Sequence, residues 1–350
     1  MRGLALGLAM LALPGGFFGT GVRTADAPAA ARDDTASFQA ALDAGRRLSL
    51  RPLPGGACYQ TYGLWVSRDR TTIDARGACI EYLGPGPVRL HSGDGDPIAS
   101  DAIFFVNRSS TNAGPPQNIK ISNARLVVPP GTDGYGVLVA GSNVILNNLS
   151  IEGTPFDAVT VTGRANGRGY AGPVLITKSH FVGGRRNAVS VVGAIGVTID
   201  SNVIEGAGNA SFVGATVSAT GPWAGIDVEP DLLSYPVKQV TIRRNTIRSN
   251  GGAGILLALA TNTGLPTVAD QIVIDGNSIT QNGVSGGPFL RGGICLQGGQ
   301  ADGNGHLGVT SNQILNNGGW GLCKHPEGFN MRITLSGNTI SGNTDGDSQW

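Results

Sequence analysis

Three carboxylates lie close together in the segment GPWAGIDVEPDLLSYP, residues 221–236. Asp227 and Glu229 are two residues apart in a stretch typical of a β-strand, so both side chains project from one face. Asp231 follows just beyond. Two carboxylates that flank a glycosidic bond can act as general acid and base, about 6.5–9.5 Å apart for inversion and about 5–5.5 Å for retention. Side chains two apart on a strand start about 6.5–7 Å apart, which favours inversion.

The same residues allow two other interpretations. Asp227, Glu229 and Asp231 could together bind Ca²⁺ with backbone oxygens and waters. This metal set is expected only for a calcium-dependent enzyme, because a hydrolase with paired carboxylates requires no cofactor. The structural interpretation is an outward Asp and Glu that are solvated or paired with arginines on neighbouring segments.

An internal repeat determines which elements position these residues. Five segments share the pattern hydrophobic-x-hydrophobic-x-x-Asn-x-hydrophobic, and they begin at Val197, Val240, Ile272, Leu307 and Ile333. Weaker copies begin at Ile119, Val144 and Val174. A third short strand follows each copy, as in DAVTVTG, NAVSVVG, AGIDVEP and AGILLAL. Three strands per unit with no helices between them predict an all-β parallel solenoid of three-strand coils, with about 8–10 turns.

One asparagine recurs at the same turn of each unit. The members are Asn202, Asn245, Asn277, Asn312 and Asn338. A tight corner between strands requires a left-handed residue, a conformation that asparagine tolerates. Stacked asparagine amides can also hydrogen-bond from coil to coil, so we expect a structural Asn ladder.

On this repeat, the chain resembles the right-handed parallel β-helix proteins of the pectate-lyase-like superfamily, over roughly residues 32–343. DDTASFQAALDAG (33–45) is similar to the short N-terminal capping helix of that family, and the segment after it to the family's first coils. Residues 1–31 have the positive start, apolar stretch and small residues of a secretory signal peptide. We therefore expect a signal peptide over 1–31, a single β-helix domain over 32–350, and a protein secreted to the periplasm or the medium.

The rows of the solenoid give the four cysteines partners. Cys295 and Cys323 fall on the same outward row of adjacent coils, about 4.8 Å apart, within reach of a disulfide. Cys58 and Cys79 lie in consecutive N-terminal coils and should pair likewise. Neither pair has a histidine at zinc spacing, so structural disulfides are predicted.

The resemblance also places the carboxylates. In this family the strand that holds Asp227 lines the substrate groove, and long loops form its walls; the 43-residue spacing from Val197 to Val240 reflects the largest insertion. Catalysis is therefore assigned to Asp227 and Glu229. Substrate-binding candidates on the loops and rims are Asp231, Trp223, Arg164, Arg168, Arg185 and Lys238. Arg186 joins the basic residues among the candidates for the base of a family lyase, which uses calcium; the family's epimerase motif lacks its histidine here.

The predicted function is a secreted, carbohydrate-active β-helix that cleaves a polysaccharide, with a glycoside hydrolase favoured over a lyase because no basic stripe is present. The alternative is a non-catalytic extracellular β-solenoid that serves as adhesin or scaffold. A net charge of +1 with 14% charged residues argues against nucleic acid as a partner. No segment predicts a membrane-spanning helix, and the sequence leaves the oligomeric state open.

Overall fold

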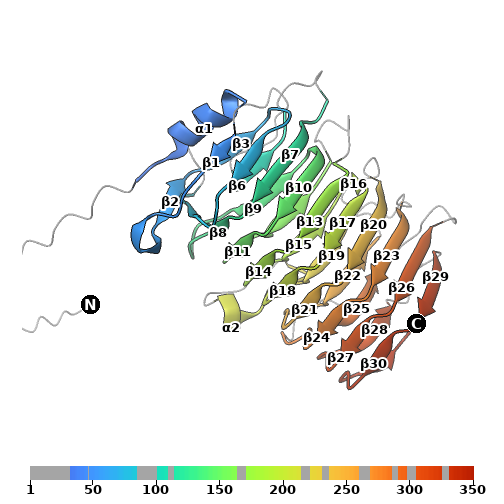
Figure 1. Ribbon diagram of the computed structural model, residues 1–350. Helices are drawn as coiled ribbons and strands as arrows, with labels where there is room; N and C mark the ends of the chain where they lie inside the picture. The colour runs from blue at the N-terminus through green and yellow to red at the C-terminus, as the bar shows by residue number, and fades with distance from the viewer. Residues whose placement is uncertain are drawn as a thin grey trace, which may run out of the picture. The chain divides into compact units, whose positions relative to one another are not determined.

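The computed structural model describes residues 32–45, 47–84, 101–108, 114–163, 171–213, 221–230, 236–259, 269–285, 291–297, 305–324 and 331–350. These residues form a solenoid of three parallel sheets, in which each coil contributes one strand to each sheet (Figure 1). Within the described residues, two sheets have ten strands and one has eleven. The predicted parallel β-helix with three strands per coil is confirmed, at the upper end of the expected number of turns.

The strands of each sheet follow one another along the solenoid. The first sheet contains β1 (Leu48–Ser49), β4 (Thr72–Asp74), β7 (Gln117–Ser122), β10 (Ser142–Asn147), β13 (Val174–Thr177), β17 (Val197–Asp200), β20 (Val237–Arg243), β23 (Ala269–Asp275), β26 (His306–Thr310) and β29 (Arg332–Ser336), with β16 (Ala194–Ile195) paired to β20. The second contains β2 (Cys58–Thr61), β5 (Cys79–Tyr82), β8 (Arg125–Val127), β11 (Ser150–Glu152), β14 (His180–Val182), β18 (Val203–Glu205), β21 (Thr246–Arg248), β24 (Ser278–Thr280), β27 (Gln313–Leu315) and β30 (Thr339–Ser341). The third contains β3 (Leu64–Val66), β6 (Ala102–Val106), β9 (Tyr135–Val139), β12 (Val159–Val161), β15 (Val189–Val191), β19 (Ile226–Val228), β22 (Ile255–Ala258), β25 (Gly292–Gln297), β28 (Trp320–Lys324) and β31 (Gly346–Ser348).

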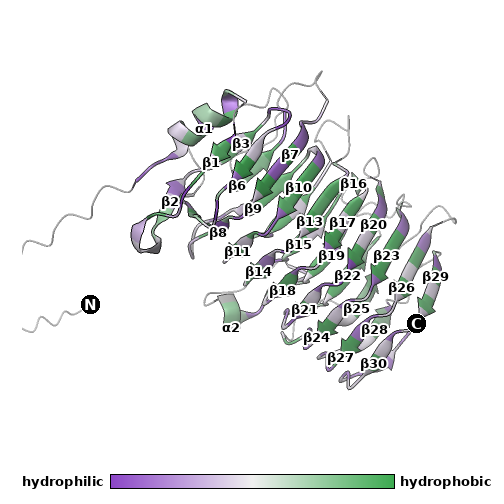
Figure 2. Ribbon diagram, viewed as in Figure 1, coloured by the Kyte–Doolittle hydropathy of each residue, from purple (hydrophilic) through white to green (hydrophobic). Residues whose placement is uncertain are grey.

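The strands pair so that the positions aligned in the sequence repeat lie next to one another. In the first sheet, Val144 pairs with Ile119 and Val174, and Ile272 pairs with Val240 and Leu307. The hydrophobic positions of the repeat therefore stack as continuous inward rows, and their side chains are almost completely buried. Figure 2 shows hydrophobic residues concentrated along the strands of all three sheets.

Helix α1 (Thr35–Asp43) closes one end of the solenoid, as the resemblance implies. Phe38 and Leu42, one helical turn apart, are buried on the same face of the helix and join the core. The other helical segments are short: η1 (Pro54–Gly56), a 3₁₀ turn, and α2 (Ala210–Val213). Among the described residues, no helix is long and apolar enough to cross a membrane. The predicted signal peptide, residues 1–31, lies outside the described residues.

Two disulfides connect neighbouring coils with the predicted pairing. Cys58–Cys79 links β2 to β5, with the two Cα atoms 4.4 Å apart. Cys295–Cys323 links β25 to β28 on the outer face of the third sheet, with the Cα atoms 4.5 Å apart.

The asparagines at the corner between the first and second sheets form a continuous hydrogen-bonded row. Asn277 donates its side-chain N–H to Asn312 Oδ1 at 2.9 Å, and its own Oδ1 accepts from the side chain of Asn245 at 2.9 Å. The same pattern connects the rest of the row, from Asn202 to Asn338. The predicted backbone conformation is wrong, however: the left-handed residue is the one before each asparagine, for example Ser201 at φ 58°. The asparagine is needed for its amide and not for its backbone.

A second asparagine ladder lies at the next corner, and sequence reasoning missed it. Asn250, Asn282, Asn317 and Asn343 are bonded in the same way, at 2.8–3.0 Å between side-chain nitrogen and oxygen. Each follows a member of the first ladder by five residues, as in NSITQN (277–282). That spacing was the available signal.

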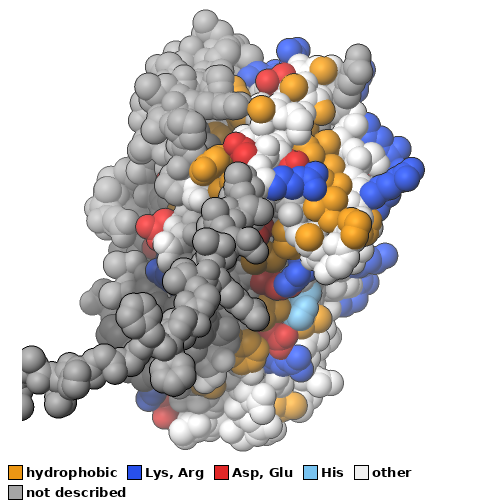
Figure 3. Space-filling view, turned by 90° about the vertical axis from the view of Figure 1, so that its left-hand side faces the viewer, with side chains coloured by type: hydrophobic (Ala, Val, Ile, Leu, Met, Phe, Trp, Pro, Cys, Tyr) orange, Lys and Arg blue, Asp and Glu red, His pale blue; other side chains and the backbone are white. Residues whose placement is uncertain are grey.

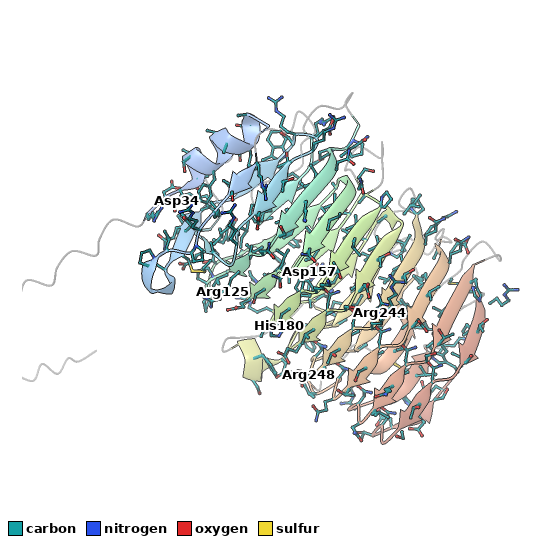
Figure 4. All side chains as sticks on the ribbon, in the orientation of Figure 1. Asp34, Arg125, Asp157, His180, Arg244 and Arg248 are labelled. Carbon is teal, nitrogen blue, oxygen red and sulfur yellow. A yellow bond between two sulfur atoms is a disulfide. The ribbon has the colours of Figure 1, made fainter. Side chains whose placement is uncertain are left out.

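The outer face of the second sheet has a row of alternating charges. Arg125 donates to both carboxylate oxygens of Glu152 at 2.9 and 2.8 Å. His180 and Arg248 each bond Glu205, at 2.7 Å. Figure 4 labels Arg125, His180 and Arg248 along this side of the solenoid, and Figure 3 shows acidic, basic and histidine side chains interspersed on the face it presents.

These contacts lower the pKa of both glutamates. For Glu152, the main cause is the hydrogen bond from Arg125. For Glu205, burial raises the pKa, but the hydrogen bonds from Arg248 and His180 outweigh it. A carboxylate with a lowered folded-state pKa stabilises the fold above its unfolded pKa, and that contribution is lost as the pH falls through the folded value.

We expect the Asn277→Ala variant to lower the free energy of unfolding by about 2–4 kcal/mol. The change leaves buried donors of Asn245 without an acceptor, and such unsatisfied groups cost about 1–3 kcal/mol each. Asn338→Ala, at the partly buried end of the row, should cost less. Urea unfolding measures both, and equal losses would contradict a cooperative ladder.

We expect Glu205→Gln to be less stable than the wild type at pH 7 by about 0.5–1 kcal/mol, because its partners are half-exposed. The difference should shrink as the pH falls below the ordinary glutamate pKa of 4.5, where the wild-type carboxylate also becomes protonated. Thermal unfolding of both proteins between pH 3 and 7 measures the gap. A gap that does not change with pH would show that the charge is not its cause.

Candidate functional site

Asp227 and Glu229 project from the outer face of the third sheet, at β19 and directly after it. Asp227 pairs in register with Ser190 of β15 on one side and Leu256 of β22 on the other. It is nevertheless fully buried, at 0% exposure, whereas Glu229 is partly exposed. The pair thus extends from the interior of this outer layer to the surface.

Apolar side chains occupy the same outer face on both sides of this position. Toward the N-terminus, Phe105 and Leu138 form one buried cluster with Ala102. Toward the C-terminus, Leu256 clusters with the Cys295–Cys323 disulfide and three alanines. Asp227 is therefore a carboxyl group in a largely apolar layer.

A network of buried polar groups holds Asp227 from the preceding coils. Asn187, immediately before β15, donates its side-chain N–H to Asp227 Oδ2 at 3.0 Å and to Ser190 Oγ at 3.2 Å. The Oδ1 atom of Asn187 accepts the backbone N–H of Ala224 at 2.9 Å. Asn187 and Ser190 are both 0% exposed.

Asp157, labelled in Figure 4, is the second buried carboxylate of the network and lies one coil before Asn187 and two coils before Asp227. Arg186 binds it with two nitrogens, Nε to Oδ1 and Nη2 to Oδ2, each at 2.9 Å. Asp157 also accepts from the hydroxyl of Thr160 at 2.8 Å and from the backbone N–H of Asn187 at 3.2 Å. Burial lowers the pKa of Arg186, but the Asp157 carboxylate outweighs it and raises the pKa above the ordinary arginine value.

The pKa of Asp227 is raised well above its ordinary value of 3.8. Burial is the main cause, followed by the negative charges of Glu229 and Asp157; Arg186 acts in the opposite direction. Among the described residues, the buried Oδ1 atom of Asp227 has no hydrogen-bond partner.

The effect of Glu229 on Asp227 fits their places on the strand. Asp227 is the central residue of β19 and Glu229 follows the strand directly, and the negative charge of Glu229 is the second cause of the raised pKa of Asp227. Two like charges so close together disfavour ionisation of both groups. The inversion that strand spacing favours for this pair stays a prediction.

The described residues do not form a calcium site of their own. No group of three or more His, Cys, Asp or Glu among them could hold a metal ion. Asp227 accepts a hydrogen bond from Asn187 on Oδ2 and is completely buried. Asp231, the third member of the predicted set, lies outside the described residues, as do Arg164 and Arg168.

The other predicted binding residues lie at three different places. Trp223 packs its side chain against Gly208 and Gly221, where an added Cβ would clash with the Cβ atom and with the indole ring of Trp223 respectively. Arg185 is partly buried beside Arg186, and its backbone N–H donates to Thr154. Lys238 is not on a loop: β20 begins at Val237, which pairs with Ala194 and Ala269, so Lys238 belongs to the first sheet.

Sequence reasoning missed Asp157 and Asn187. They occupy the same position in successive coils, two residues before the strand, in DAVTV (157–161) and NAVSV (187–191). A polar residue repeated at that position, before outward Thr160 and Ser190, was the available signal. Arg186 was considered only as a base, whereas it is paired with Asp157.

A family model for the right-handed β-helix region matches residues 102–301, more than half of the chain. The chain belongs to the right-handed β-helix family. The resemblance on which the sequence analysis relied is therefore confirmed at the level of fold.

Solved structures with this fold are similar to the chain at low sequence identity. An iota-carrageenase from A. fortis matches with a TM-score of 0.56 and 11% identity, over 90% of this chain and 85% of that one. The Streptococcus pneumoniae surface protein and adhesin PfbA matches with a TM-score of 0.51 and 12% identity, over 91% and 95%. A capsular polysaccharide depolymerase, the tailspike gp49 of Acinetobacter baumannii bacteriophage Fri1, matches with a TM-score of 0.51 and 12% identity, over 87% and 55%.

The chain spans about half the length of that depolymerase, and 54% of another iota-carrageenase chain that it matches. No curated protein sequence matches it. At such identities, the matches establish the fold alone.

We expect Asp227→Asn to make the protein more stable at pH 7, with Tm higher by roughly 2–4 °C for each kcal/mol gained. Asparagine keeps an oxygen for Asn187 and removes a buried charge. Because the folded-state pKa of Asp227 is raised, the wild type loses stability as the pH rises from the ordinary value of 3.8 through the folded value. The gain should therefore be largest at high pH and smallest near pH 4, as measured by thermal unfolding. A variant that is less stable at every pH would contradict this account.

Proposed function

We propose that the protein is a polysaccharide hydrolase that binds its substrate over the outer face of the third sheet and cleaves it at Asp227 and Glu229. The observation that supports this most directly is the completely buried carboxyl group of Asp227, held by Asn187 in an otherwise apolar layer and two residues from the partly exposed Glu229. Catalytic acids are commonly carboxyl groups whose pKa is raised by burial and by a neighbouring carboxylate. The structural interpretation was a carboxylate paired with an arginine. Within the described residues, such an ion pair is found for Asp157, with Arg186, and not for Asp227.

In this proposal, the pair enters the reaction with one proton. Glu229, the partly exposed member, faces the sugar and passes the proton to the oxygen of the leaving group as the glycosidic bond breaks. The pair is then ionised, and it takes up one proton from solvent before the next turnover. The water that adds to the anomeric carbon is activated by a second carboxylate farther away, about 6.5–9.5 Å for an inverting enzyme. Asp231 is the candidate that the sequence offers.

Hydrolysis is favoured over elimination because two of the basic residues considered for a lyase, Arg186 and Lys238, are not placed to act as its base. A lyase requires a cation or calcium to neutralise a uronate carboxylate, and a base such as Arg or Lys. Two nitrogens of Arg186 bind Asp157, and Lys238 belongs to the first sheet. Trp223 and Arg185 stay proposals as substrate-binding residues, together with Arg164 and Arg168.

We also propose that the protein acts outside the cytoplasm. Two disulfides in the solenoid persist in an oxidising compartment. The sequence of residues 1–31 is consistent with an export signal. A polymer substrate outside the cell suits this location.

The decisive experiment is a screen of purified protein on a polysaccharide panel, with reducing ends and absorbance at about 235 nm as readouts, with and without Ca²⁺. New reducing ends without absorbance, abolished in the Asp227→Asn/Glu229→Gln variant, are expected. The Asp200→Asn/Glu205→Gln variant, which changes two carboxylates on the other sheets, should stay active. Both signals rising together would identify a lyase. No cleavage by folded protein across the panel would reject catalysis in favour of the adhesin or scaffold alternative.

A further inference from the structure

We propose that Asn187 is a positioning residue for the Asp227–Glu229 pair: it fixes the Asp227 carboxyl by binding Oδ2, so that Oδ1 is the oxygen left to carry a proton. This inference rests on the proposed function, because it assigns Asn187 a part in that reaction. Asn187 itself is buried behind the pair and does not meet the substrate.

The orientation of the Asn187 amide is fixed by its neighbours. Its Oδ1 atom accepts the backbone N–H of Ala224 at 2.9 Å, and a backbone N–H can only donate. The amide nitrogen must therefore point the other way, toward Asp227 and Ser190. A flipped amide would place nitrogen against the Ala224 N–H and lose both contacts.

The Asp157–Arg186 pair holds the backbone of Asn187 from the opposite side. Asp157 receives four hydrogen bonds: two from Arg186, one from Thr160 and one from the Asn187 N–H. A buried carboxylate with this many donors has little freedom to rotate. The peptide of Asn187 is thus anchored to a fixed group before its side chain reaches Asp227.

The two carboxylate oxygens of Asp227 consequently have different partners. Oδ2 accepts from Asn187, while the buried Oδ1 receives no hydrogen bond within the described part of the chain. Oδ1 is therefore the oxygen on which Asp227 can carry a proton. Without Asn187, the carboxyl group can turn about its last torsion, and the direction in which it presents that proton is no longer fixed.

The local character of this network distinguishes Asn187 from the structural asparagines. Each ladder asparagine bonds to the next asparagine, over four or five coils. Asn187 bonds to a carboxyl group instead, and in the following coils its position is taken by Ala224 and Ala253. A purely structural device would be expected to repeat.

The test compares Asn187→Asp with Asn187→Ala. The aspartate keeps an oxygen for the Ala224 N–H but cannot donate to Asp227 when it is ionised, so it preserves the structural role and removes the positioning role. The matched control is Asn282→Asp, a ladder residue that is equally buried and also accepts a backbone N–H, from Asn250. We expect kcat to fall at least tenfold in both Asn187 variants with KM within about twofold, while Asn282→Asp keeps the wild-type kcat.

Retention of kcat in Asn187→Asp, at the level of Asn282→Asp, would overturn the proposal. A readout independent of activity is the crystal structure of Asn187→Ala, in which the Asp227 carboxyl should turn away from its wild-type orientation. An unchanged orientation also rejects the positioning role. If the wild type cleaves no polysaccharide but the carboxyl turns in the variant, then the proposed function fails while the role of Asn187 in orienting Asp227 stands.

Discussion

The structure depends on one constraint: every coil must pair in parallel register with the coils on both sides. Register aligns each sequence position with its counterpart one coil away, so a residue type repeated in the sequence becomes a row in space. The inward rows form the core. The two asparagine ladders satisfy buried backbone N–H groups at two corners where the strands turn. At the candidate site the strands pair in the same register, but the residue types do not repeat from coil to coil.

The third sheet is covered on both faces near the site, which is the usual condition of parallel strands. Its outer row includes Leu138, Leu256 and Cys295, each almost completely buried. A carboxyl group in this row loses hydration, and its pKa rises, as for Asp227. An aspartate on the outer face of the first sheet behaves differently: Asp200 pairs with Arg244, and the hydrogen bond from Arg244 is the main cause of its lowered pKa.

The features of the fold that follow from the sequence repeat were predicted correctly. The register and the cysteine pairs follow from aligning positions along the chain, and the cap follows from the family resemblance. Sequence reasoning assigned the left-handed backbone conformation to the asparagine, whereas the preceding residue adopts it. The asparagine is needed at that corner because its side-chain amide bonds to the next coil. Sequence reasoning also missed the contact from Asn187 to Asp227, which joins residues 40 apart across an insertion. Strand rise predicted how far apart the backbone positions of Asp227 and Glu229 are, but side-chain torsions decide the distance between their carboxyl groups.

A scaffold has no evident use for Asp227. Replacing a buried ionisable group by a well-packed apolar residue is often neutral or stabilising, and the neighbouring coil has leucine at the corresponding position. The chain instead places Asn187 and Ser190 next to Asp227, and Arg186 of the same coil binds Asp157 of the coil before it. Such a network has to be fully satisfied to be tolerated in an apolar layer, and within the described residues the exception is the Oδ1 atom of Asp227. Breaking the local rule at a single position, with support from two preceding coils, is typical of functional sites, and it is the physical argument for chemistry at this pair.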